Sequence, residues 1–161
     1  MNVISLGVTN SDITNYIYNF TCDEQALCFL AGLIAQQAKI GDCFALYGDL
    51  GAGKSTFSRA FIKRLCGAAT EVCSPTFTIS QSYSIDCPSS QDCAIIWHYD
   101  LYRMESYGEL HEIGLDETFD TAITLIEWPE IAKSLLPANT MHITFAFADN
   151  SDYRDIEIKY N

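Results

Sequence analysis

Residues 48–55 have the sequence GDLGAGKS. Of all segments in this chain, this one has the residue types and spacing that point most specifically to one kind of chemistry. It matches the phosphate-binding pattern G-x-x-x-x-G-K-[ST], in which glycines let the backbone turn tightly and present successive N–H groups to a phosphate. Lys54 supplies a cation for the β- and γ-phosphates, and Ser55 supplies a hydroxyl for Mg²⁺. The residues predicted to bind a nucleotide are Asp49, Leu50, Gly51, Ala52, Gly53, Lys54, Ser55 and Thr56.

Two acidic residues follow apolar runs, as expected of a carboxylate that holds Mg²⁺ or orients a water molecule. Asp100 follows AIIWHY, and Glu127 follows AITLI. The residues alone do not rank the two, and each has a plainer interpretation as a polar residue that leaves a strand into solvent. His98 has no partner at a spacing typical of a metal site, so we interpret it as a structural or surface residue.

Thr76 and Trp128 each have a functional and a structural interpretation. Pro75 restricts the residue before it to extended geometry, which would hold the Thr76 hydroxyl near a γ-phosphate or its Mg²⁺ as part of a switch segment. The alternative is that residues 74–76 simply enter a strand. Trp128 either stacks on a base or packs in the core, and a lone tryptophan more often packs in the core.

The sequence around residues 48–55 predicts the strand–loop–helix unit that the pattern requires. Residues 43–47 are a short apolar run typical of a buried strand. After the loop, Phe57, Ala60, Phe61 and Leu65 recur at helical spacing, and Gly67 ends the helix. The amino terminus of that helix adds a positive field to the loop.

The rest of the chain alternates strand and helix signals. Thr21 and Glu24 fit a capping box, which explains Glu24 without any nucleotide contact, and Gly41 ends the helix that follows. Helical signals recur at 107–119, with an interruption at Gly114, and from Pro129 until Pro137. Further strands are predicted at 13–20, up to residue 83, at 94–98, 122–126, 141–147 and 154–160, with a loop at 84–92 and a hairpin between the last two strands.

These elements predict an α/β fold of the P-loop NTPase type. We expect three layers, with a mixed central sheet, helices on both faces and a nucleotide at the carboxyl ends of the parallel strands. A length of 161 residues predicts a single domain, residues 1–161, with residues 1–12 as a candidate flexible segment.

Composition limits the partners and the compartment. A net charge of −12 with only nine Lys and Arg disfavours direct binding to nucleic acid. The acidic surface either suits a basic protein partner or only aids solubility. No apolar run is long enough to span a membrane. The seven cysteines have irregular spacing, and residues 1–10 do not resemble a secretory signal. We therefore expect free thiols in a reducing compartment, the cytoplasm.

Taken together, the motifs resemble the TsaE family, small ATPases of bacterial tRNA threonylcarbamoyladenosine biosynthesis. The phosphate-binding pattern alone is generic, whereas HYDLYR and LIEWPE at their separation are far more specific. The matching segments are 48–55, 74–78 (SPTFT), 98–103 (HYDLYR), 109–110, 113–115 and 125–130 (LIEWPE).

The resemblance implies an ATP-hydrolysing subunit that binds ATP or ADP with Mg²⁺ and acts with a TsaB–TsaD pair. The subunit would then contact tRNA only indirectly, through those partners. It implies that Lys54 holds phosphate, that Ser55 and Glu127 hold Mg²⁺, and that Asp100 helps hydrolysis. It also implies that Thr76 is a switch residue and that Glu24 and Trp128 lie near the nucleotide. The implied catalytic residues are Lys54, Thr76, Asp100 and Glu127.

Two other functions on the same fold stay open. A small-molecule kinase usually clamps the transferred phosphoryl group with several arginines. Of the four arginines here, Arg103 is the only candidate clamp, because Arg59 and Arg64 belong to the helix after the loop. A non-hydrolysing nucleotide sensor would use Asp100 and Glu127 to hold Mg²⁺ without positioning water.

Overall fold

The computed structural model describes residues 7–9, 16–85 and 94–160. The start of the predicted first strand at 13–15, most of the 84–92 loop, Cys87 and Cys93 lie outside these residues. Of the candidate flexible segment 1–12, only residues 7–9 are described, and they form a short strand.

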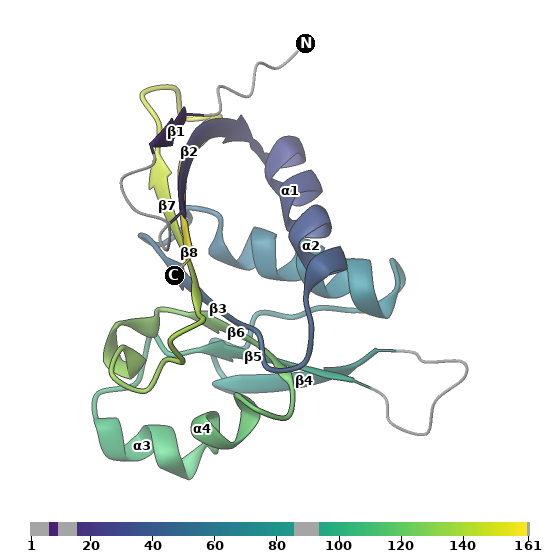
Figure 1. Cartoon of the computed structure of the whole chain (residues 1–161), viewed down its shortest axis with the longest axis vertical. Coiled ribbons are helices and arrows are strands. Elements are labelled where there is room, and N and C mark those ends of the chain that lie inside the picture. The colour runs from purple at the N-terminus through teal and green to yellow at the C-terminus, as the bar shows by residue number, and fades with distance from the viewer. Residues whose placement is uncertain (1–6, 10–15, 86–93, 161) are drawn as a thin grey trace.

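The described residues form eight strands, four α-helices and one 3₁₀ helix (Figure 1). The strands are β1 Gly7–Thr9, β2 Tyr16–Asp23, β3 Cys43–Tyr47, β4 Ser80–Ser84, β5 Ile95–Asp100, β6 Ile123–Glu127, β7 Met141–Phe147 and β8 Tyr153–Tyr160. The helices are α1 Glu24–Gln37, α2 Lys54–Cys66, α3 Tyr107–Glu112, α4 Leu115–Thr118 and the 3₁₀ helix η1 Pro129–Ala132.

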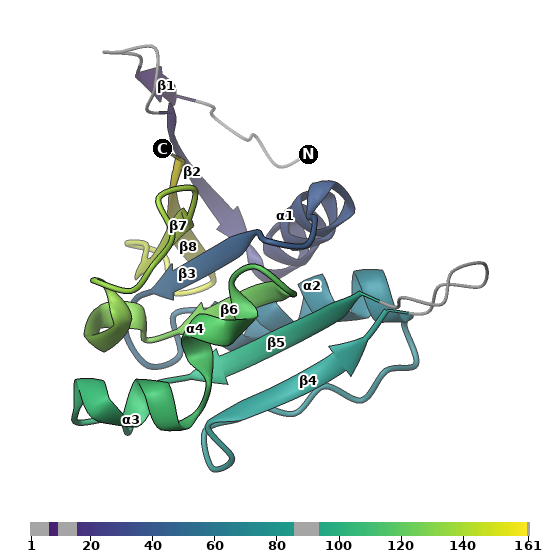
Figure 2. The ribbon, with the colours of Figure 1, turned by 60° about the horizontal axis from the view of Figure 1, so that its bottom comes forward.

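All eight strands belong to one mixed sheet with the order β1-β2-β8-β7-β3-β6-β5-β4. The four neighbouring strands β7, β3, β6 and β5 are parallel, and the remaining pairs are antiparallel. Figure 2 shows β3, β6, β5 and β4 side by side. Because Leu46 and Asp100 both pair with Glu127, the carboxyl ends of β3, β6 and β5 meet at one edge of the sheet. The predicted hairpin is confirmed as β7–β8.

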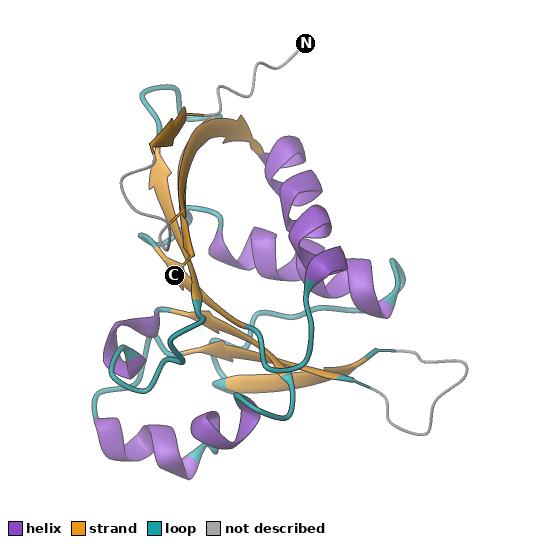
Figure 3. Cartoon of the chain, viewed as in Figure 1, coloured by secondary structure: helices purple, strands orange, loops and turns teal. Residues whose placement is uncertain are grey.

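Helices cover both faces of the sheet, so the predicted three-layer α/β fold is confirmed (Figure 3). On one face, Phe44 of β3 packs in a cluster with Leu27 of α1 and Phe61 of α2. On the other face, Cys43 belongs to a second cluster that includes Leu110 of α3. The alternation of neighbouring side chains between the two clusters follows from the twofold period of a strand. No helix of the described ranges has the length and apolarity that a bilayer crossing requires.

The predicted capping box at Thr21 is wrong. The N-cap of α1 is Asp23, whose Oδ1 accepts a hydrogen bond from the Ala26 N–H at 2.8 Å. Thr21 belongs instead to β2, where it pairs with Asp155 of β8. Strand pairing therefore extends β2 past the position at which local pattern would start the helix. Glu24 becomes the first residue of α1, and its side chain is exposed.

Two predicted helix ends are also misplaced. Helix α1 ends at Gln37 with Ala38 as its C-cap, so it stops before the chain reaches Gly41. Gly41 has a φ of +93° and donates its N–H to Ala122 O at 2.9 Å, so it shapes the entry into β3 and does not end α1. The 3₁₀ helix η1 begins at Pro129 as predicted but ends at Ala132, well before Pro137.

Candidate functional site

Most of the predicted site residues line one pocket at the carboxyl ends of β3, β6 and β5. The pocket has a volume of about 200 Å³. Asp49 and Ala52 do not line it, although the Ala52 N–H donates to Asp49 O at 3.1 Å within the same loop. The residues that line the pocket are Leu50, Gly51, Gly53, Lys54, Ser55, Thr56, Thr76, Asp100, Tyr102, Glu127 and Trp128.

Residues 48–55, which we call the glycine loop, connect β3 to α2 through left-handed backbone. Gly53 is the N-cap of α2 with a φ of +117°, and no side chain of the described residues caps the helix there. The first turn of α2 contains no acidic residue. The first N–H groups of a helix have no acceptor within it, so they and the helix dipole favour an anion at this end.

Lys54 lies across the glycine loop. Its Nζ donates to Gly48 O at 2.5 Å and to Asp49 O at 2.9 Å, and it lies 3.9 Å from the centroid of the Trp128 ring. Burial lowers the pKa of Lys54, and the nearby carboxylates of Glu127 and Asp100 oppose that shift. The side chain is thus a buried cation held at the mouth of the loop by neutral carbonyl groups.

Glu127 is almost fully buried and accepts three side-chain hydrogen bonds. Ser55 Oγ donates to Oε2 at 2.7 Å, while Ser58 Oγ and His98 Nε2 lie 3.0 and 2.8 Å from Oε1. Burial raises the pKa of this carboxyl, but the hydrogen bond and charge of His98 and the two serine bonds outweigh burial and hold the pKa below its ordinary value. The interpretation of Glu127 as a residue that leaves its strand into solvent is therefore wrong.

The Ser55 hydroxyl and Glu127 Oε2 fit a Mg²⁺ site. Mg²⁺ binds oxygen ligands octahedrally at about 2.0–2.1 Å, which separates adjacent ligands by about 2.9 Å. The observed Oγ–Oε2 distance of 2.7 Å is close to that spacing. Within the described ranges, no three His, Cys, Asp or Glu side chains cluster as metal ligands. A Mg²⁺ ion held by one or two protein oxygens together with phosphate oxygens matches this donor set.

Asp100 is paired with Glu127 across β5 and β6 but has different side-chain partners. Thr76 Oγ1 donates to Asp100 Oδ2 at 2.7 Å, and the Tyr102 N–H donates to Oδ1 at 3.1 Å. Asp100 is 5% exposed, so the solvent-facing interpretation is wrong here too. The structure thereby distinguishes the two carboxylates, because Glu127 contacts the Ser55 hydroxyl and Asp100 contacts the Thr76 hydroxyl.

Residues 75–79 form a turn and do not enter a strand directly. The Ile79 N–H donates to Pro75 O at 2.6 Å, and β4 starts only at Ser80. Ile79 has a φ of +67°, which is rare for a β-branched residue and costs about 1–3 kcal/mol. The strand-entry interpretation of residues 74–76 is therefore wrong, and the segment that carries Thr76 contains backbone strain.

Trp128 lies in the pocket and is half-buried. Its φ is +57°, and its N–H donates to Leu46 O at 3.2 Å. The ring contacts Tyr102 at a centroid distance of 4.9 Å. The left-handed backbone directs the indole toward Lys54 and the pocket, so the core-packing interpretation does not describe it.

A second pocket of about 250 Å³ adjoins the first, and the two share Gly51, Gly53 and Thr56. Arg154 lines this second pocket, although the sequence alone does not assign it to a site. No local signal places it there, because its position depends on the pairing of Cys22 with Arg154 between β2 and β8. The rest of the lining comes from α1 and the β7–β8 hairpin, namely Glu24, Leu27, Ser151 and Asp152.

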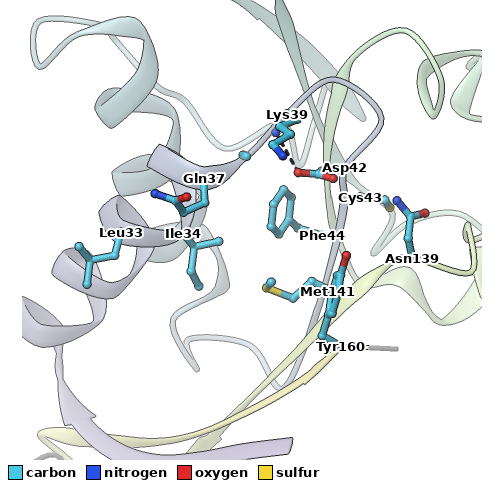
Figure 4. A pocket seen from close by; sticks show the side chains of 11 residues that line it. Leu33, Ile34, Gln37, Lys39, Asp42, Cys43, Phe44, Asn139, Met141 and Tyr160 are labelled. Carbon is cyan, nitrogen blue, oxygen red and sulfur yellow. Dashed lines mark hydrogen bonds between the residues drawn. The ribbon is translucent and has the colours of Figure 1, made fainter. Parts of the chain in front are cut away.

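A third cavity, of about 430 Å³, lies at the opposite end of the parallel strands. Figure 4 shows Leu33 and Ile34 of α1 lining one part of this cavity and Phe44, Met141 and Tyr160 lining another. None of the predicted site residues lines this cavity.

Comparison with known proteins finds a family model and relatives that share one name. Residues 21–156 match the model of the family described as threonylcarbamoyl adenosine biosynthesis protein TsaE. Two proteins named tRNA threonylcarbamoyladenosine biosynthesis protein TsaE are similar. That of Rickettsia conorii is 42% identical over 122 residues, which cover 76% of this chain and 66% of the relative. That of Bacillus subtilis is 39% identical over 128 residues, which cover 79% of this chain and 75% of the relative.

A solved structure agrees with these sequence matches. The crystal structure of Bacillus subtilis YdiB superposes with a TM-score of 0.69 at 28% identity, and the match covers 94% of this chain and 88% of that one. The fold, the family model and the relatives point the same way, and they confirm the resemblance carried by the motifs: this chain belongs to the TsaE family.

Proposed function

We propose that this protein binds ATP with Mg²⁺ and hydrolyses it as a subunit of tRNA threonylcarbamoyladenosine biosynthesis. The observation that carries the proposal is the convergence of the glycine loop, the Ser55–Glu127 pair and the Thr76–Asp100 pair on one pocket. The pathway follows from the names of the relatives.

Each group in the pocket has a proposed role in this reaction. The N–H groups of the glycine loop and the Lys54 cation bind the phosphates, while Ser55 and Glu127 hold Mg²⁺, which neutralises charge on the phosphate oxygens. The adjoining pocket with Glu24 and Arg154 offers space for the nucleoside. Asp100 orients the attacking water once its Oδ2 is released from Thr76.

The Thr76–Asp100 bond supports activation by a partner protein. In this structure the bond occupies the carboxylate oxygen that would orient water. Leu50 of the glycine loop and Phe77, next to Thr76, are 78% and 83% exposed, as expected of apolar residues that a partner covers. We propose that the TsaB–TsaD pair is this partner. Because this chain is acidic, we propose that it contacts tRNA only through that pair.

A cytoplasmic location fits this role. Among the described residues, Cys22, Cys28, Cys43 and Cys73 are free thiols, which persist in reducing compartments.

The kinase alternative requires Arg103 to reach the phosphate pocket, and Arg103 does not line that pocket. The guanidinium of Arg103 lies 4.6 Å over the Phe77 ring. A phosphoryl clamp must reach the transferred group, so this placement favours hydrolysis over transfer to a small molecule.

Partner activation predicts a rate difference between the isolated protein and its complex. Adding the TsaB–TsaD pair should raise ATP turnover at least about tenfold, because ordering the Thr76 segment would free Asp100. Phosphate release measured at saturating ATP and Mg²⁺ checks this. The complex containing Lys54→Ala sets the background rate. Equal turnover with and without the pair would contradict activation.

Asp100→Asn separates hydrolysis from a sensor function. We expect turnover by the complex to fall about 100-fold, because the amide cannot accept a proton from water as a carboxylate does, while ATP affinity stays within about threefold. Single-turnover kinetics and calorimetry measure the two quantities. Asp120→Asn, a change at an exposed carboxylate, is the matched control. Unchanged turnover in Asp100→Asn would favour the sensor.

A further inference from the structure

We propose that His98 and Ser58 are positioning residues that hold Glu127 Oε1, so that Oε2 stays directed toward the metal. The inference rests on the proposed function, since it concerns the carboxylate that would hold Mg²⁺. The sequence pattern identified neither residue as part of the site.

The two carboxylate oxygens of Glu127 have different partners. His98 Nε2 and Ser58 Oγ both lie at Oε1, at 2.8 and 3.0 Å. The partner of Oε2 is the Ser55 hydroxyl, which belongs to the pocket lining. One carboxylate oxygen thus faces the protein interior, and the other faces the pocket.

The fold fixes both donors independently of any ligand. Asp100 pairs with Glu127 between β5 and β6, and His98 lies two residues earlier on the same face of β5. Ser58 lies one turn after Lys54 in α2, and its single hydroxyl hydrogen is shared between Glu127 Oε1 at 3.0 Å and Lys54 O at 3.1 Å. Both side chains are buried, so the packed surroundings hold them in position.

The chemistry of the pair assigns the proton of His98. An ionised carboxylate only accepts hydrogen bonds, and Nε2 lies 2.8 Å from Oε1, so the hydrogen of this bond is on Nε2 of the imidazole. His98 therefore donates to Oε1. Partners behind a metal-binding carboxylate fix its orientation, and their loss typically weakens metal affinity about 10- to 100-fold.

The test compares Mn²⁺ affinity, measured by electron paramagnetic resonance at saturating ADP, in full-length variants. His98→Asn places its amide short of Oε1 and should weaken Mn²⁺ binding about tenfold or more. His98→Gln carries an N–H donor near the former Nε2 position and should bind Mn²⁺ within about threefold of the wild-type protein. Ser58→Ala should weaken Mn²⁺ binding in the same direction as His98→Asn.

Two controls separate positioning from a general structural role. ADP affinity without metal should stay within about twofold in every variant, because neither side chain lines the phosphate pocket, and thermal melting reports whether each one folds. If His98→Asn does not fold, Ser58→Ala carries the test. If His98→Asn or Ser58→Ala bound Mn²⁺ with wild-type affinity, the inference would be overturned, but the proposed function would stand. Absence of ADP-dependent Mn²⁺ binding in the wild-type protein would overturn the proposed function, and the inference with it.

Discussion

Lys54→Ala is expected to reduce the affinity for ATP at least about 100-fold, because each hydrogen bond to a charged group contributes about 1.5–3 kcal/mol. The buried ammonium is the one side-chain cation that lines the pocket within the described residues. In this structure Nζ is held by the carbonyls of Gly48 and Asp49, so it lies at the loop. Isothermal titration calorimetry with ATP and Mg²⁺ measures the loss.

A second lysine in the same helix provides the control. Lys63→Ala, more than two turns further along α2, removes an equal charge away from the pocket and should leave ATP affinity within about twofold. Unchanged affinity in Lys54→Ala would mean that the glycine loop does not bind phosphate, and the proposed function would fall with it.

Gly48→Ala is expected to destabilise the protein by about 2–6 kcal/mol, because backbone strain of about 1–3 kcal/mol combines with an overpacking cost of about 1–3 kcal/mol. Gly48 has a φ of +131°, and a Cβ at this position would overlap the carbonyl oxygen of Phe145 in β7. Urea unfolding followed by circular dichroism measures the change in the free energy of unfolding.

Gly67→Ala isolates the contribution of strain. Gly67 also has a positive φ, of +100°, but a Cβ there would meet no atom within 4 Å. We expect a loss of about 1–3 kcal/mol, from strain alone. If Gly48→Ala cost no more than Gly67→Ala, the close approach of the glycine loop to β7 would not constrain the fold.

The elements around the glycine loop could be predicted because their signals are local. The apolar run at 43–47, the helical spacing from Phe57 and the stop at Gly67 all depend on neighbours in sequence, and β3 and α2 match them. The acids that end apolar runs, Asp100 and Glu127, likewise end β5 and β6.

The contacts that sequence could not reveal depend on pairing between distant segments. His98 has no partner at a metal-site spacing, yet strand register brings it to Glu127, 29 residues away. The capping box at Thr21 fails for the same reason, because β8 extends β2. Arg154 reaches the second pocket only through that strand pair.

The pairing of β2 with β8 has a consequence for synthesis on the ribosome. Thr21 and Asp155, which are bonded across these strands, are separated by 134 residues. Such a contact forms slowly, because a long loop must close before the pairing can stabilise it. Arg154 therefore reaches Glu24 only after β8 has been translated, so the second pocket is completed after the first, whose lining ends at Trp128.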